Sequence, residues 1–211
     1  MIRIVGLLLL LCSCATTDAS ERLLFQDDFA DLRHWSVEGS GAVAAQDGTL
    51  EWDCRGTREG TAWCRTRFEG PTRVTYEVQI LDGRNNINFF GYGGMELEPA
   101  ARRTGEYGEY HVFPNYLITY LLEEGRWRIR FRKNPGFALL SEARVEGPEP
   151  SRWRKMEYLF SRNGALRLSV DGAPVHEVRD AAPLPASGYH GLRTWRTKLR
   201  YRNFRVYALP G

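Results

Sequence analysis

The most constraining feature of the sequence is a strict alternation of apolar residues and arginines around position 130. Three large apolar side chains alternate with four guanidinium groups: Trp127, Ile129 and Phe131 with Arg126, Arg128, Arg130 and Arg132. A period of two indicates a half-buried β-strand and places the arginines roughly 6.6 Å apart on one face. Because like charges on one face repel one another, we expect acidic side chains on neighbouring strands, or an anionic ligand, to neutralise them.

Similar strand signals recur along the chain, and no stretch has a convincing helical period. Asn163-Gly164 and Asp171-Gly172 separate the strands of a meander, and both dipeptides favour two-residue hairpin turns, whose central positions take positive φ. In the last strand the alternation breaks near Asn203, which predicts a β-bulge that lets Tyr201 and Phe204 share a face. Many short strands with regular turns predict an all-β fold, an antiparallel two-sheet β-sandwich of jelly-roll type.

The amino terminus has the features of a bacterial lipoprotein leader. Arg3 precedes an apolar signal-peptide core over 4–11, too short for a permanent membrane span, and Leu11-Cys12-Ser13-Cys14 resembles a lipobox that ends at Cys14. We expect a lipoprotein signal peptide over 1–13, a lipidated tether over 14–22 and one β-sandwich domain over 23–209. These features predict a cell-envelope protein, lipid-anchored at the outer membrane and facing the periplasm or the surface. An ordinary cleaved signal peptide is the alternative.

Two cysteines, Cys54 and Cys64, remain after processing. In an oxidising compartment we expect them to form a disulfide, which closes a loop of about ten residues and contributes roughly 2–3 kcal/mol. A metal site at these cysteines is disfavoured because no histidine lies near them in the sequence.

Charge and composition limit the classes of ligand and cofactor that the chain is expected to bind. The formal net charge is only +3, with acidic residues concentrated in the first half and basic residues in the second, so the folded chain largely neutralises itself and has no nucleic-acid signature. The four histidines show no metal spacing. We expect no cofactor, with a structural calcium at Asp27, Asp28 and Asp31 as the open alternative.

Several segments together resemble a known superfamily. They are the opening Asp-Asp-Phe…Trp…Asp-Gly-Thr-Leu over 27–50, Arg-Lys-Asn-Pro-Gly-Phe over 132–137, and Gly-Tyr-His-Gly-Leu-Arg-Thr-Trp over 188–195. Over residues 24–208 the chain resembles the concanavalin-A-like (laminin-G-type) jelly rolls and, within them, the YesU-like family of unknown function. The resemblance implies a jelly roll associated with the breakdown of plant or algal polysaccharides, and it brings no activity with it.

One functional hypothesis is a glycan-binding lipoprotein whose partner is a polysaccharide or oligosaccharide. Sugar sites use flat aromatic rings and polar side chains, and a uronate carboxylate additionally favours the bidentate fork of arginine. The candidate binding residues are Tyr120, Arg130, Arg132, Asn134, Arg193 and Trp195. Two of them have structural alternatives: Tyr120 belongs to the core if its strand face points inward, and Trp195 fits either role.

A second hypothesis is an enzyme on the same fold, a polysaccharide lyase or a glycoside hydrolase. A lyase needs a base beside the uronate, for which Tyr110 and His111 are weak candidates. A hydrolase needs two carboxylates roughly 5–9.5 Å apart, and the Glu-x-Asp-x-x-Glu strand of laminarinase-type sandwiches is absent from the sequence. A structural or partner-binding envelope protein is the third class, and the sequence leaves the choice between enzyme and binder open.

Overall fold

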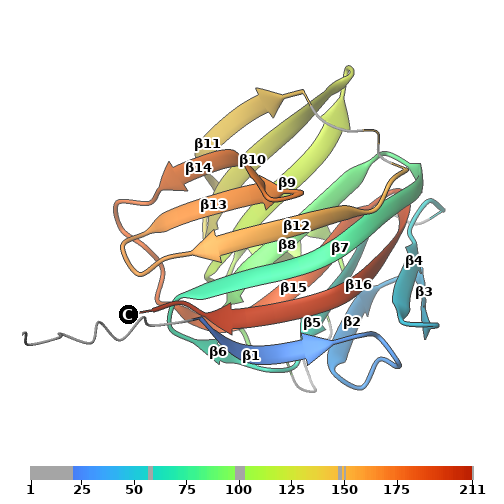
Figure 1. Cartoon of the computed structure of the whole chain (residues 1–211), viewed down its shortest axis with the longest axis horizontal. Coiled ribbons are helices and arrows are strands. Elements are labelled where there is room, and N and C mark those ends of the chain that lie inside the picture. The colour runs from blue at the N-terminus through green and yellow to red at the C-terminus, as the bar shows by residue number, and fades with distance from the viewer. Residues whose placement is uncertain (1–20, 57–58, 98–102, 147–148, 150, 211) are drawn as a thin grey trace, which may run out of the picture.

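The alternating strands form two antiparallel sheets packed face to face, as Figure 1 shows for the computed structural model of the chain. The structure describes residues 21–56, 59–97, 103–146, 149 and 151–210. The predicted all-β jelly-roll sandwich is confirmed. Within the described residues, no helix has the length and apolar character needed to cross a membrane.

The first sheet, sheet A, is at the front of Figure 1. Its strands run in the order β14 (Ala173–Arg179), β13 (Ala165–Val170), β12 (Arg154–Phe160), β7 (Thr72–Gly83), β16 (Thr197–Ala208), β4 (Thr49–Asp53) and β3 (Ala42–Gln46), with β1 (Arg22–Asp27) paired to β16. The 163–164 and 171–172 turns join β12, β13 and β14 into the predicted meander.

The second sheet, sheet B, lies behind sheet A in that view. Its strands run in the order β11 (Ala138–Val145), β10 (Arg126–Asn134), β9 (Asn115–Glu123), β8 (Asn86–Gly93), β15 (Ser187–Trp195), β5 (Glu59–Cys64) and β2 (Trp35–Gly39), with β6 (Phe68–Glu69) paired to β15. A short 3₁₀ helix, η1 (Tyr107–His111), lies between β8 and β9 in the sequence.

The core between the sheets is rich in aromatic residues. Tyr76 of sheet A stacks on Tyr158 and meets Tyr201 edge to face, and Phe89 of sheet B stacks on Tyr158 with their ring centroids 4.3 Å apart. The bulge predicted in the last strand is confirmed. Asn203 has φ +56°, and the register shift around it leaves both Tyr201 and Phe204 fully buried.

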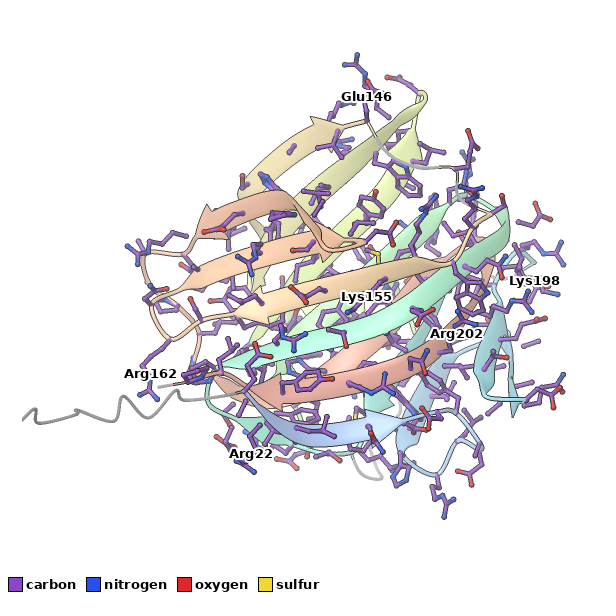
Figure 2. All side chains as sticks on the ribbon, in the orientation of Figure 1. Arg22, Glu146, Lys155, Arg162, Lys198 and Arg202 are labelled. Atoms are coloured by element: carbon purple, nitrogen blue, oxygen red, sulfur yellow. The ribbon has the colours of Figure 1, made fainter. Side chains whose placement is uncertain are left out.

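The outer face of sheet A carries charges that pair across neighbouring strands. Arg202 of β16 pairs with Glu77 of β7 at 2.6 Å, and Lys198 of β16 pairs with Glu51 of β4 at 2.8 Å. Figure 2 labels Arg202 and Lys198 on this sheet, together with Lys155 of β12. These charges are therefore paired within sheet A. In sheet B, the arginine strand β10 is paired in the same way: Arg126 with Glu146, and Arg128 with Glu123 and Glu142, as the alternation around position 130 led us to expect.

Candidate functional site

A row of polar side chains crosses the outer face of sheet B. The strand register places Arg130 opposite Thr119, Thr119 opposite Asn88, Asn88 opposite Arg193, and Arg193 opposite Thr61. We call these five residues the polar row. Alternation explains why each side chain points outward, since the residues on either side of it in its strand belong to the inner, apolar face.

The next row along the strands is apolar and is covered by the segment that contains η1. Leu117, Phe90 and Trp63 form this row, and Tyr110 and Met95 pack on it in a second hydrophobic cluster separate from the main core. Trp63 stacks on Phe90 with ring centroids 4.9 Å apart. The segment 103–113, which contains η1, therefore covers part of the outer face beside the polar row. We call it the covering segment.

Glu38 of β2 fastens this covering segment. Its carboxylate is buried and accepts hydrogen bonds from the Tyr110 hydroxyl at 2.8 Å, the Trp63 indole at 3.2 Å and the Arg103 guanidinium at 2.6 Å. A buried carboxylate is tolerated when several donors satisfy its oxygens. Glu38 thus holds the covering segment on the sheet.

Four residues of the polar row, all but Thr61, and the residues beside them line a pocket of about 370 Å³. The pocket is lined by Glu59, Asn86, Asn88, Tyr107, Thr119, Leu121, Glu123, Arg130, Arg193 and Trp195. Most of these residues belong to β5, β8, β9, β10 and β15, and Tyr107 of η1 supplies an aromatic ring. The lining combines hydrogen-bonding amides and hydroxyls, four ionisable groups that carry charge at neutral pH, and two aromatic rings.

Arg193 is the most buried charged group of the pocket, at 1% exposure. Its guanidinium pairs with Glu59 and donates to the Thr61 hydroxyl at 2.8 Å and to the Gly105 carbonyl at 3.0 Å. It also lies over the Tyr110 ring, 4.7 Å from the centroid. Burial lowers the pKa of Arg193 to about 9, which still leaves it charged at neutral pH. Arg193 therefore joins β15, β5 and the covering segment.

Arg130 makes fewer hydrogen bonds within the described protein than Arg193 does. Its Nε donates to Glu142 of β11 at 3.1 Å, and Glu142 also accepts from Arg128 at 2.8 Å. These two arginines hold the pKa of Glu142 below its usual value. Within the described residues Arg130 makes no other hydrogen bond, so its two terminal NH₂ groups remain available at the pocket.

Asn86 and Asn88 provide the neutral polar groups on the pocket floor. The Asn88 amide donates to the Asn86 side-chain oxygen at 2.5 Å, and both residues are less than 5% exposed. The Asn86 amino group and the Asn88 oxygen keep further hydrogen-bonding capacity on the pocket side. Burial raises the pKa of Tyr107, and the charges of Arg132 and Arg130 oppose that rise, which places this phenol beside the arginines.

Three of the six predicted binding residues, Arg130, Arg193 and Trp195, line the pocket together. The other three do not. Tyr120 points into the core and stacks on Trp127 with ring centroids 4.2 Å apart, because its strand presents the tyrosine face inward. The proposed binding role of Tyr120 is therefore corrected to packing.

Asn134 and Arg132 are held in local structure at the end of β10. Asn134 is fully buried, donates to the Asn115 side chain at 2.9 Å and accepts from the Phe137 backbone N–H at 2.9 Å. Arg132 donates to the Phe137 carbonyl at 3.1 Å and lies over the Phe137 ring, 3.9 Å from its centroid. These contacts shape the turn after β10 and keep both side chains out of the pocket lining.

The two weak catalytic candidates also lie outside the pocket lining. Tyr110 is fully buried, its hydroxyl donates to Glu38, and burial raises its pKa far above the ordinary value, which disfavours the phenolate that a base would require. The His111 ring stacks on Phe137 at 3.9 Å, and burial lowers its pKa. Both residues support the covering segment.

The sequence reasoning missed Tyr107, Asn86, Asn88, Thr119, Glu59 and Glu123. Period-two alternation does place Asn86 and Asn88 on one face of a strand, as it does Thr119 and Leu121. It does not say that these faces come together, because β8 lies between β9 and β15 only through the sheet topology.

The predicted disulfide is absent from the structure. Cys54 lies beside Gly41, just beyond the end of β2, whereas Cys64 is opposite Trp35 at the start of that strand. Cys54 follows β4 of sheet A and Cys64 ends β5 of sheet B, and no disulfide joins them. Both side chains are buried, and burial raises the pKa of the Cys64 thiol to about 12.

Two of the three aspartates considered for calcium, Asp27 and Asp31, make contacts within the local fold. Asp27 accepts from the Phe29 backbone N–H at 2.7 Å and from the Trp35 indole at 2.8 Å, and Asp31 pairs with Arg33. Over residues 21–56, 59–97, 103–146, 149 and 151–210, no group of three or more metal-ligating side chains comes together.

Solved structures with the same fold include several proteins named for carbohydrates. A protein of unknown function with a galectin-like fold from Bacillus subtilis has a TM-score of 0.78, with 22% identity over 90% of this chain and 98% of that one. The carbohydrate-binding module CBM66 from Bacillus subtilis has a TM-score of 0.59, with 11% identity over 83% of this chain and 96% of that one. A β-1,3-1,4-glucanase from a mouse hindgut metagenome has a TM-score of 0.59, with 13% identity over 87% of this chain and 98% of that one.

These likenesses show the fold, and no curated protein matches the chain. The family model described as "Domain of unknown function (DUF1961)" matches residues 22–206, nearly the whole sandwich. The resemblance to a jelly-roll family of unknown function is thereby confirmed. The chain belongs to the DUF1961 family.

Proposed function

We propose that this protein is an exported, lipid-anchored carbohydrate-binding protein that holds a uronate-containing glycan in the pocket of sheet B. The observation that carries the proposal is the composition of one lining: the Asn86–Asn88 pair for sugar hydroxyls, the rings of Tyr107 and Trp195, and the available NH₂ groups of Arg130. Carbohydrate pockets combine these groups, and a guanidinium fork matches the geometry of a carboxylate.

The fold comparisons support the carbohydrate part of this proposal. CBM66 is a carbohydrate-binding module, and the domain of Emp46p, with a TM-score of 0.64, is a carbohydrate-recognition domain. A fold shared with such proteins raises the expectation of sugar binding but does not establish it, since one fold hosts many functions. The pocket residues of this chain provide the independent support.

Binding is better supported than catalysis. The two glutamates of the pocket, Glu59 and Glu123, belong to β5 and β9, whose backbones are three strand spacings or roughly 14 Å apart, a wider spacing than the carboxylate separation that glycoside hydrolysis uses. Each is also paired with an arginine, Glu59 with Arg193 and Glu123 with Arg128. The phenol of Tyr107 has a raised pKa, which does not suit the base of a lyase.

An anchor at Cys14 would join the domain at the start of β1, at the far end of β16 from the pocket. Arg22 begins β1 opposite Ala208 at one end of β16, and the pocket residue Trp195 lies next to the other end of that strand. The twelve residues of β16 separate these ends by roughly 35–40 Å. A domain tethered at Arg22 therefore presents its pocket at the end away from the tether.

The test is binding of the mature protein to immobilised pectin- and ulvan-type polymers and to a neutral glucan. We expect retention on the acidic polymers and about tenfold weaker retention for Arg130→Ala, the size expected for loss of one charge-assisted contact. Arg22→Ala, which removes an exposed arginine far from the pocket, serves as the control. Failure of the parent protein to bind any glycan refutes the proposal and favours a structural or partner-binding role. Appearance of unsaturated sugar ends during incubation with uronate polymers would instead establish a lyase.

A further inference from the structure

We propose that Arg84 and Arg196, held around Trp195, form a second anion-binding subsite at the rim of the pocket. The ligand is then an extended glycan chain with several negative groups, one near Arg130 and another at the rim. This inference rests on the proposed function and makes it more specific. The pocket alone would accept a single acidic sugar, whereas the pocket and the rim together require a chain with several negative charges.

The first support is the arrangement of the two arginines. The guanidinium carbon of Arg196 lies 5.2 Å from the centroid of the Trp195 ring, and that of Arg84 lies 5.8 Å from it. A cation over an indole ring is held in place while its N–H donors stay free for an anion. Both arginines are exposed, and within the described chain no carboxylate pairs with either. They differ in this from Arg128 and Arg193, which are neutralised by glutamates.

The second support is the backbone that carries these arginines. Arg196 has φ +48°, in the left-handed region that residues with a Cβ rarely adopt. Its carbonyl accepts from the Arg84 N–H at 3.1 Å, and a Cβ on Gly83 would lie 2.4 Å from that same oxygen. The two turns, between β7 and β8 and between β15 and β16, are thus locked together. Backbone strain of this kind is concentrated at ligand clamps, where the surrounding structure fixes it.

The third support is the spacing between the rim and Arg130. Trp195 lies on β15 and Arg130 on β10, with β8 and β9 between them. Three strand spacings amount to roughly 14 Å, and the asparagine pair lies between the two positions. One sugar ring cannot reach both groups of arginines. A chain of several sugars that crosses the strands can do so, with its hydroxyls over the amides.

The experiment is a series of oligomers of increasing length titrated against the mature protein. Oligogalacturonides of one to six units provide carboxylates, and sulfated galactan oligomers of matched length provide sulfates. We expect affinity to rise with length until both subsites are filled. The Arg84→Ala/Arg196→Gly double variant should bind the longest oligomer about tenfold more weakly and the monomer unchanged, as expected for two exposed charge contacts. Glycine is chosen at 196 because it accepts the positive φ without strain.

A matched control removes two exposed positive charges elsewhere, Arg22→Ala/Lys155→Ala, both labelled on the sheet A side in Figure 2. This control should keep the parent's affinity for every length. If the Arg84/Arg196 variant keeps the parent's affinity for the hexamer, or matches the control, the rim subsite is wrong while the pocket proposal stands. If the parent binds no acidic oligomer, the proposed function itself fails. The series with the larger loss identifies the anionic group as carboxylate or sulfate.

Discussion

Replacement of Arg193 by methionine tests whether this buried guanidinium holds the site together. The variant keeps an apolar side chain of similar length but removes the charge that satisfies Glu59, the Thr61 hydroxyl and the Gly105 carbonyl. Removal of one partner of a buried pair costs about 3–5 kcal/mol, because the other charge is left without compensation. For a domain of this size each kcal/mol lowers Tm by about 2–4 °C, so we expect a fall of roughly 6–20 °C.

The measurement is equilibrium unfolding in urea together with thermal unfolding followed by circular dichroism. Arg193→Lys is the informative companion, since lysine keeps the charge but lacks the planar fork that reaches three acceptors at once. We expect its loss to lie between the parent and Arg193→Met. A Tm within about 2 °C of the parent for Arg193→Met would refute the argument, because that shift corresponds to no more than about 1 kcal/mol.

Three further predictions follow from other buried groups and from the amino terminus. Glu38→Gln removes the charged acceptor shared by Arg103 and Tyr110, and we expect it to destabilise the protein by about 1–3 kcal/mol in urea unfolding; an unchanged midpoint contradicts this role. Burial lowers the pKa of His190 to about 3, so the unfolded chain binds one more proton than the folded chain between pH 6.5 and 3. The free energy of unfolding therefore decreases as the pH is lowered through this range, by up to about 1.4 kcal/mol per pH unit. His190→Phe should flatten that slope, and an equal slope in urea titrations at pH 7, 6 and 5 argues against it. Cys14→Ala should move the protein from the membrane fraction to the soluble fraction, and unchanged fractionation means that the lipobox prediction fails.

The fold was accessible from the sequence because its signals are local. Alternation around Arg130 defines β10, the Asn-Gly and Asp-Gly turns define the β12–β14 meander, and the break at Asn203 marks the bulge in β16. Each of these depends on residues a few positions apart. The structure follows them closely, since strand periodicity and turn chemistry agree at each of these places.

The site was only partly accessible because it depends on register between distant strands. Arg130 and Arg193 were found as arginines on strands, but their common pocket exists because β8 and β9 separate β10 from β15. Alternation divides a strand into two faces without saying which face is inner, and Tyr120 shows this ambiguity. The disulfide prediction for Cys54 and Cys64 is wrong for the same reason. The two cysteines are close in sequence, but one follows a strand of sheet A and the other ends a strand of sheet B.

The position of β16 has a consequence for the order in which the domain can form. This last strand pairs with β7 on one edge and with β4 and β1 on the other, so it pairs with three strands that all lie within residues 22–83. Sheet A cannot be completed before the final strand has been synthesised. Such long-range pairing slows folding, because the entropy of closing long loops must be lost before the contacts form. Removal of the last strand should leave β7, β4 and β1 without their common partner.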